Sequence, residues 1–260
     1  MYSGTRVENS IRIVEDAKQY GVPLRVMGGC AVSIHCPQYR KTLEEKMERR
    51  AGDIDLVGLS NDRKKINEFM ERNGFTSQRI TGMRNREEYT MQNKELVEVF
   101  LDKLEMCHDI DLRKRVQLDF PTIPVADLLL QKTQIIKLNE KDIKDIIILL
   151  LEHELGSTDN DVINTDYIAQ MLSLDWGFCY TVTRNLNFSG TFLQKYAGML
   201  SEMERNEITD KIKKIISRIE KEPKTVKWKV RARVGTKKIW YREVEEKEVE
   251  TSLIEALRRT

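Results

Sequence analysis

Two features that the sequence lacks exclude whole classes of protein: paired cysteines and long apolar runs. The four cysteines are scattered over 260 residues without motif spacing, so we expect reduced thiols in a cytoplasmic protein rather than a disulfide-stapled secreted one. The longest apolar run, residues 146–151, is far shorter than the roughly 20 residues that span a bilayer. The first residues lead directly into a polar helical pattern, which is not that of a signal peptide.

The sequence also lacks a strong excess of either charge. The formal net charge is +2, so the whole molecule is not a general binder of polyanions, although its basic residues are unevenly spread. Charged residues make up 33% of the chain, which indicates a heavily solvated, helix-rich surface. Hydrophobic residues make up 40%, which is enough for a sizeable core in one large domain or two modest ones.

The periodicity of the apolar residues indicates the fold class. Short apolar runs at residues 24–27, 54–59 and 95–101 predict strands separated by helical patterns. From residue 126 the pattern is helical, with turns expected near Trp176 and Ser189. We therefore predict an α/β (α+β) fold: a small mixed β-sheet flanked by helices, then a helical domain and a C-terminal β-hairpin. The expected divisions are a sheet-containing core at 1–125, a helical extension at 126–156 and a helical C-terminal domain at 157–260.

The predicted hairpin rests on alternation near the C-terminus. Apolar residues occupy every second position from Val226 to Val234, which is the period of a strand, and Gly235 would turn the chain back. A helix is also compatible with this composition. Cations on one face of such a strand would suit the phosphates of nucleic acid, although most charge runs simply face water. These candidate nucleic-acid contacts are Lys227, Lys229, Arg231 and Arg233.

Gly28-Gly29 follows the first predicted strand and precedes a helical pattern. Two glycines allow the backbone to approach a phosphate closely, and the N-terminus of a helix presents unpaired N–H groups to it. Alone, this arrangement is equally typical of a tight turn between a strand and a helix.

Asp53-Ile54-Asp55 enters the second predicted strand. Since side chains alternate along a strand, both carboxylates share one face, about 6.6 Å apart, while Ile54 points into the core. Two like charges on one face repel each other unless cations lie between them, and Mg²⁺ prefers carboxylate oxygens. A solvated strand start is the alternative interpretation of this pair.

A third acid occurs in the run Val97-Glu98-Val99-Phe100-Leu101-Asp102. A carboxylate between apolar neighbours is costly to bury without a partner, and a metal ion is one such partner. Glu98 is favoured because valines flank it, whereas Asp102 lies at the end of the strand. A carboxylate on the open face of an antiparallel hairpin is the other interpretation of Glu98.

The order V-M-G-G-C-A-V, D-I-D-L-V, V-E-V-F-L resembles the nucleotidyltransferase superfamily, whose fold is that of DNA polymerase beta. The resemblance implies that Gly28 and Gly29 contact the triphosphate of a nucleoside triphosphate. It also implies that Asp53, Asp55 and Glu98 hold Mg²⁺ or Mn²⁺ and form the catalytic centre. The sequence departs from the usual pattern at Gly29, where serine is common, and at Glu98, where aspartate is common.

Residues 126–132 and 141–146 more narrowly resemble the rear motifs of AbiEii-type nucleotidyltransferase toxins and their relatives. That resemblance implies that Lys132 and Asp142, together with Asp145, help to bind the nucleotide. Two structural alternatives stand beside it. Asp142 would favour the N-terminus of its helix through the helix dipole, and Lys132 would cover apolar surface with its stem.

The sequence thus predicts a metal-dependent nucleotidyltransferase that moves a nucleoside monophosphate to a hydroxyl of RNA, a protein or a small molecule. A toxin of a toxin–antitoxin pair is compatible with this activity. The alternative is a non-catalytic module of the same fold that binds nucleic acid or protein through its basic C-terminal segment. The sequence does not specify the acceptor, the nucleotide or the oligomeric state.

Two further groups of residues are weaker candidates. Arg49 and Arg50 precede the Asp53–Asp55 strand and could meet phosphates, although a solvated basic turn is the plainer interpretation. His35-Cys36 and Cys107-His108 could be imagined as zinc ligands, but neighbouring ligands on one turn point apart, so no zinc site is expected.

Overall fold

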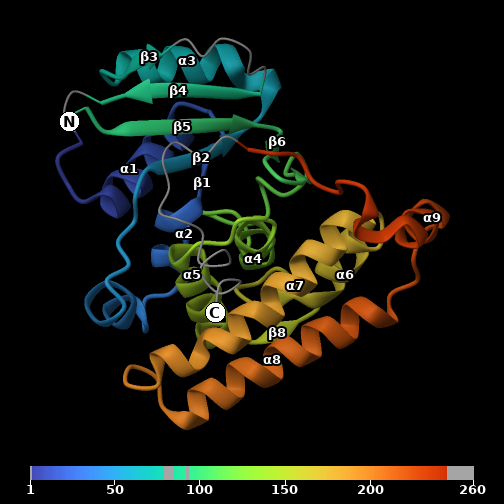
Figure 1. Cartoon of the computed structure of the whole chain (residues 1–260). Coiled ribbons are helices and arrows are strands. Elements are labelled where there is room, and N and C mark those ends of the chain that lie inside the picture. The colour runs from blue at the N-terminus through green and yellow to red at the C-terminus, as the bar shows by residue number, and fades with distance from the viewer. Residues whose placement is uncertain (1, 79–84, 92–93, 245–260) are drawn as a thin grey trace. The chain divides into compact units, whose positions relative to one another are not determined.

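The computed structural model describes residues 2–78, 85–91 and 94–244, arranged in two compact units (Figure 1). The first unit comprises Met1–Pro37, Arg50–Leu104 and Asp109–Pro124, and the second comprises Gln38–Arg49, Glu105–His108 and Val125–Thr260. In the part of the chain that the structure describes, no helix is both long enough and apolar enough to cross a membrane.

The first unit is built around a five-stranded mixed sheet in the order β1-β2-β5-β4-β3. Strand β2 pairs antiparallel with β1 and parallel with β5, and the remaining neighbours are antiparallel. A smaller two-stranded sheet joins β6 and β7. The strands are β1 (Arg25–Met27), β2 (Ile54–Gly58), β3 (Thr76–Gln78), β4 (Arg86–Thr90), β5 (Leu96–Leu101), β6 (Lys103–Glu105) and β7 (Asp109–Asp111).

Three helices pack against this sheet: α1 (Arg6–Gln19), α2 (Gly28–His35) and α3 (Arg63–Arg72). Helix α1 begins with a capping box in which the Thr5 side chain accepts from the backbone of Glu8, and the Glu8 carboxylate accepts from that of Thr5. The predicted α/β fold with a small mixed sheet flanked by helices is therefore confirmed.

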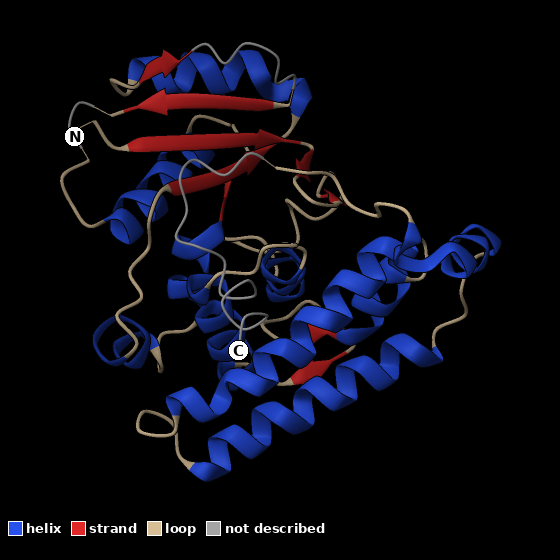
Figure 2. Cartoon of the chain, in the orientation of Figure 1, coloured by secondary structure: helices blue, strands red, loops and turns tan. Residues whose placement is uncertain are grey.

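The second unit is mainly helical (Figure 2). Apolar faces of α5, α6, α7 and α8 supply most of its buried side chains. Short strands β8 (Leu155–Gly156) and β9 (Ile163–Asn164) pair in parallel. Residues Thr42–Lys46 form one π-helical turn. The helices are α4 (Val125–Thr133), α5 (Glu140–Glu152), α6 (Thr165–Leu172), α7 (Trp176–Phe192), α8 (Glu202–Lys221) and α9 (Val226–Val234).

Two expectations for the second unit are wrong. The turn predicted near Ser189 does not form, because α7 continues through it and the buried Ser189 hydroxyl donates to the Asn185 carbonyl one turn earlier. The predicted C-terminal β-hairpin does not form either, since residues 226–234 make helix α9 and the described residues that follow contain no strand.

The physical reason for the helix is local. Within the part of the chain that the structure describes, no strand pairs with this segment, and the Thr225 hydroxyl accepts from the Trp228 amide at 3.2 Å as an N-cap. Gly235, with a φ of +59°, ends the helix in a conformation that suits glycine.

Replacing Thr225 with alanine should weaken the first turn of α9 by about 1 kcal/mol, which corresponds to roughly fivefold faster exchange of its amide protons. Hydrogen exchange followed by NMR would measure this at Trp228. Thr236→Ala is the matched control, because Thr236 is exposed beyond the end of the helix. Equal exchange in the two variants would contradict the assigned cap.

Candidate active site

The strand register of the first unit places the predicted acidic residues on neighbouring strands. Asp55 on β2 lies opposite Glu98 on β5 in the parallel pair, and opposite Met27 on β1 in the antiparallel pair. Asp53 lies in a bend directly before β2, two residues from Asp55. The end of β1, the start of β2 and the middle of β5 thus meet at one place in the sheet.

Gly28 connects this place to a helix N-terminus. It is the first residue of α2, and no side chain caps that helix at Met27. Its φ is +67°, in the left-handed region that favours glycine. A Cβ built on Gly28 would lie 3.0 Å from the Asp55 Cγ and closer still to its Oδ2, so the Gly28 backbone rests against the Asp55 carboxylate. Helix α2 therefore begins at Gly28 itself, whereas the sequence predicted a helical pattern that starts after Gly28-Gly29.

Glu98 is buried and forms an ion pair with Arg86. The Arg86 Nη2 contacts Glu98 Oε1 and lies 3.0 Å from Glu88 Oε1, and these two acids are opposite each other in the β4–β5 register. The guanidinium group also lies 5.3 Å from the centre of the Phe100 ring. Arg86 is thus the cation beside Glu98 in this structure, and a metal ion bound to Glu98 would take over that contact.

Asp102, the alternative third acid, has a different role. Its φ is +66°, and its Oδ1 accepts from the Ser60 backbone amide at 2.9 Å. Its own amide donates to the Gly58 carbonyl at 2.9 Å. Asp102 therefore holds the chain that leaves β2, and the choice of Glu98 as the third acid stays a prediction.

The three acids are not gathered as tightly as a loaded metal site would be. Asp53 is exposed, and Asp55 is half-buried. Among the described residues, the oxygens of Asp53, Asp55 and Glu98 do not form a group in which all lie within 4.8 Å of one another. The donor set itself, three carboxylates on adjacent strands, suits a hard divalent cation such as Mg²⁺. Their assignment as metal ligands stays a prediction.

Lys132 and Asp142 do come together, within the second unit. Lys132 lies in the last turn of α4, and its Nζ lies 3.3 Å from Asp142 Oδ1 and 2.8 Å from Asp145 Oδ2. Arg49 Nη2 lies 2.8 Å from the same Asp145 oxygen. Lys132, Asp145 and Arg49 are all buried. This four-residue cluster is hereafter called the buried ion cluster.

The buried ion cluster corrects the interpretation of Arg49 as part of a solvated turn, and it adds a partner to the interpretation of Asp142. Arg49 does not belong to a solvated turn, because Asp145 holds it in the interior of the unit. Asp142 lies in the first turn of α5, where Asn139 accepts from its amide, so the helix dipole also favours its charge. A role for Lys132 and Asp142 in nucleotide binding stays a prediction.

Burial is the largest influence on the pKa values of Asp142 and Lys132. It raises the pKa of Asp142 above its ordinary value, although the nearby Lys132 opposes that shift. Burial acts to lower the pKa of Lys132, but the carboxylates of Asp145 and Asp142 outweigh it and leave the pKa above its ordinary value. Lys132 therefore stays charged at neutral pH.

The residues that sequence reasoning missed are Arg86 and the pairing of Arg49 with Asp145. Arg86 carried no motif, because its role depends on the register of β4 against β5. A signal for Asp145 was present: it directly precedes the apolar run of residues 146–151 on α5, and an acid buried with such a run needs an internal partner.

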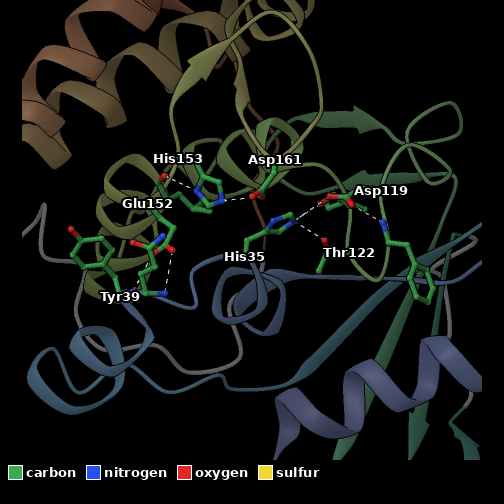
Figure 3. A network of polar contacts seen from close by, with 11 residues as sticks. His35, Tyr39, Asp119, Thr122, Glu152, His153 and Asp161 are labelled. Atoms are coloured by element: carbon green, nitrogen blue, oxygen red, sulfur yellow. Dashed lines mark hydrogen bonds and ion pairs between the residues drawn. The ribbon is translucent and has the colours of Figure 1, made fainter.

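His35 and His108 each have partners inside their own unit. His35 ends α2, and its Nε2 lies 2.6 Å from Thr122 Oγ1 and 3.5 Å from Asp119 Oδ2 (Figure 3). His108 Nε2 lies 2.9 Å from Thr181 Oγ1 in the second unit. These contacts are those of packed polar residues, and the expectation that no zinc site forms stays a prediction.

Comparison with known proteins gives weak likenesses. No protein family and no curated protein matches the chain. Among solved structures, the antibiotic-resistance factor ANT(2'')-Ia is 11% identical, with a TM-score of 0.40 over 64% of this chain and 92% of its own. An antigenic nucleotidyltransferase-like protein from Paracoccidioides brasiliensis is 14% identical, with a TM-score of 0.38 over 86% of this chain and 96% of its own. Likenesses of this strength carry no argument about activity, which rests on the residues of the chain itself.

Proposed function

We propose that the first unit is a metal-dependent nucleotidyltransferase that moves a nucleoside monophosphate from a nucleoside triphosphate to an acceptor hydroxyl. One observation carries the proposal: the strand register places Asp55 opposite Glu98 and sets Asp55 against Gly28 at the start of α2. Carboxylates beside the N-terminus of a helix form a site for a cation and a phosphate together.

Each residue has a distinct task in this proposal. The amides at the start of α2 bind phosphate oxygens, and Gly28 lets the backbone come close enough to do so. Asp53, Asp55 and Glu98 would hold divalent cations, which supply charge neutralisation to the triphosphate and acidify the acceptor hydroxyl.

The transfer itself is a single displacement at the α-phosphorus. A bond forms between the acceptor oxygen and the α-phosphorus, and the bond from that phosphorus to the bridging oxygen of the β-phosphate breaks. Pyrophosphate leaves with the electron pair, and the acceptor's proton passes to Glu98 or to water. Most of the acceleration comes from positioning and from the neutralisation of charge.

Isothermal titration calorimetry with ATP, CTP, GTP and UTP tests the proposal. We expect the chain to bind at least one of them in the presence of Mg²⁺, and Asp53→Asn/Asp55→Asn to lose that binding by about 100-fold or more, since charged contacts are worth roughly 1.5–3 kcal/mol each. The preferred base would then guide the search for the acceptor.

The chain offers a matched control, because Asp109-Ile110-Asp111 repeats the same tripeptide on β7. These two acids pair with Lys103 and Arg113 and lie apart from the β1–β2–β5 junction. Asp109→Asn/Asp111→Asn should bind the nucleotide as the unmodified chain does. Absence of binding by the folded chain would favour the non-catalytic alternative.

A further inference from the structure

The segment from Pro223 to Arg242 concentrates positive charge without any acid to offset it. It contains eight lysines and arginines and no aspartate or glutamate. In contrast, the preceding helix α8 pairs cations with acids, as in Lys211–Glu207 and Arg218–Asp166. The eight cations are Lys224, Lys227, Lys229, Arg231, Arg233, Lys237, Lys238 and Arg242.

The helical form of α9 arranges these charges differently from the strand that the sequence predicted. With 3.6 residues per turn, Val226 and Val230 form a ridge, and they are 78% and 56% exposed. One pair of cations follows each side of the ridge, and Trp228 faces the other way and is half-buried. The flanking pairs are Lys227 with Arg231 and Lys229 with Arg233.

Most of these cations have no acidic partner among the described residues. Five exposed side chains on and after α9 have no carboxylate of the described chain within ion-pair distance. Arg231 instead donates to the carbonyls of Gly235 at 2.6 Å and Lys238 at 2.8 Å, which fixes the turn after the helix. The five side chains are Lys227, Lys229, Arg233, Lys237 and Lys238.

An aromatic cluster adjoins this charge. Trp176 and Tyr180 on α7 stack with their ring centres 5.2 Å apart and an angle of 19° between the planes. Trp240 meets both rings edge-on, and its Nε1 donates to Thr181 Oγ1 at 3.1 Å. The Arg231 guanidinium lies 4.9 Å from the centre of the Trp176 ring. Tyr180 is 38% exposed, so part of its ring meets solvent.

From this arrangement we propose that α9, Lys237, Lys238 and the Trp176–Tyr180–Trp240 cluster form a binding surface for single-stranded nucleic acid. Unpaired cations on both sides of a short ridge fit a phosphate backbone, and a partly exposed aromatic ring fits an unstacked base. The polar end of Trp240 is occupied internally, which leaves ring faces rather than N–H groups for recognition. Binding would therefore be sequence-tolerant.

The two other polyanionic partners fit less well. A membrane-bound helix carries large apolar side chains on its exposed face, whereas the ridge of α9 carries only valines over nine residues. An acidic peptide would account for the charge but not for the stacked rings beside it. The proposed surface does not depend on the proposed nucleotidyl transfer, and a nucleic acid bound there need not be the acceptor.

Fluorescence anisotropy of the full chain with a labelled single-stranded RNA of about 20 nucleotides tests the proposal, at salt concentrations from about 50 to about 200 mM. The test variant is Lys227→Gln/Lys229→Gln/Arg233→Gln/Lys237→Gln. Its affinity should fall on the order of 100-fold, and the slope of log affinity against log salt should lessen by about 0.7 for each lost phosphate contact. Tyr180→Ala should weaken binding by about tenfold through lost stacking.

The matched control removes four lysines elsewhere, in Lys64→Gln/Lys65→Gln/Lys213→Gln/Lys214→Gln, which are exposed or half-exposed on α3 and α8. This control should bind RNA as the unmodified chain does. Asp55→Asn should also bind RNA as the unmodified chain does, whether or not it loses nucleotide binding. Equal loss in both quadruple variants would overturn the proposal, since any four positive charges would then serve. No RNA binding at low salt, or displacement of RNA by phosphatidylserine vesicles, would overturn it too.

Discussion

Gly28→Ala is expected to lower the free energy of unfolding of the first unit by about 2–5 kcal/mol and to abolish nucleotide binding. Two costs add up. A residue with a Cβ in the left-handed region loses about 1–2 kcal/mol. The new methyl group would also collide with the Asp55 carboxylate, and overpacking of this kind costs about 1–3 kcal/mol.

Gly21→Ala separates the two costs. Gly21 has a similar φ of +79°, but a Cβ there would meet nothing within 4 Å. Gly21→Ala should lower the free energy of unfolding by about 1–2 kcal/mol, from the backbone conformation alone, and nucleotide binding should stay intact. Chemical denaturation followed by far-ultraviolet circular dichroism measures both variants. Equal losses at the two positions would show that Gly28 does not rest against Asp55.

Asp145→Asn is expected to lower the free energy of unfolding of the second unit by about 3–5 kcal/mol, because it breaks a buried ion pair and leaves its partners in place. The Asp145 carboxylate is fully buried and receives both Lys132 and Arg49 at 2.8 Å. Without its charge, the repulsion between these two cations would act in a region where water cannot screen it.

Asp210→Asn is the control for this substitution. Asp210 also lies on a helix and also pairs with a lysine, Lys213, at 3.4 Å, but its side chain is 65% exposed. An exposed pair contributes about 0–1 kcal/mol, so this variant should unfold almost as the unmodified chain does. If the two variants lost the same stability, the buried ion cluster would not be holding α4, α5 and Arg49 together.

The sequence predicted those parts of the fold that depend on local patterns. Strand β2, its acids and the glycine turn after β1 were visible because alternation and composition are properties of short segments. The contact between Arg86 and Glu98 was not visible, since it depends on which strands become neighbours. The same holds for Arg49 and Asp145, which are 96 residues apart in the chain.

The error at α9 shows where local patterns mislead. Alternation from Val226 to Val234 has the period of a strand, yet Val226, Val230 and Val234 are also spaced four apart, as on one side of a helix. A strand at this position would need a neighbouring strand to pair with, and residues 2–78, 85–91 and 94–244 supply none beside it. Thr225 as N-cap and Gly235 as helix end were the signals that favoured the helix.

All three tryptophans of the chain belong to one neighbourhood. Trp176, Trp228 and Trp240 lie on α7, on α9 and in the segment after α9, and two of them contact each other. Intrinsic tryptophan emission therefore originates in the second unit and reports on the surroundings of these three side chains. The emission spectrum should respond directly to any ligand that stacks beside Tyr180.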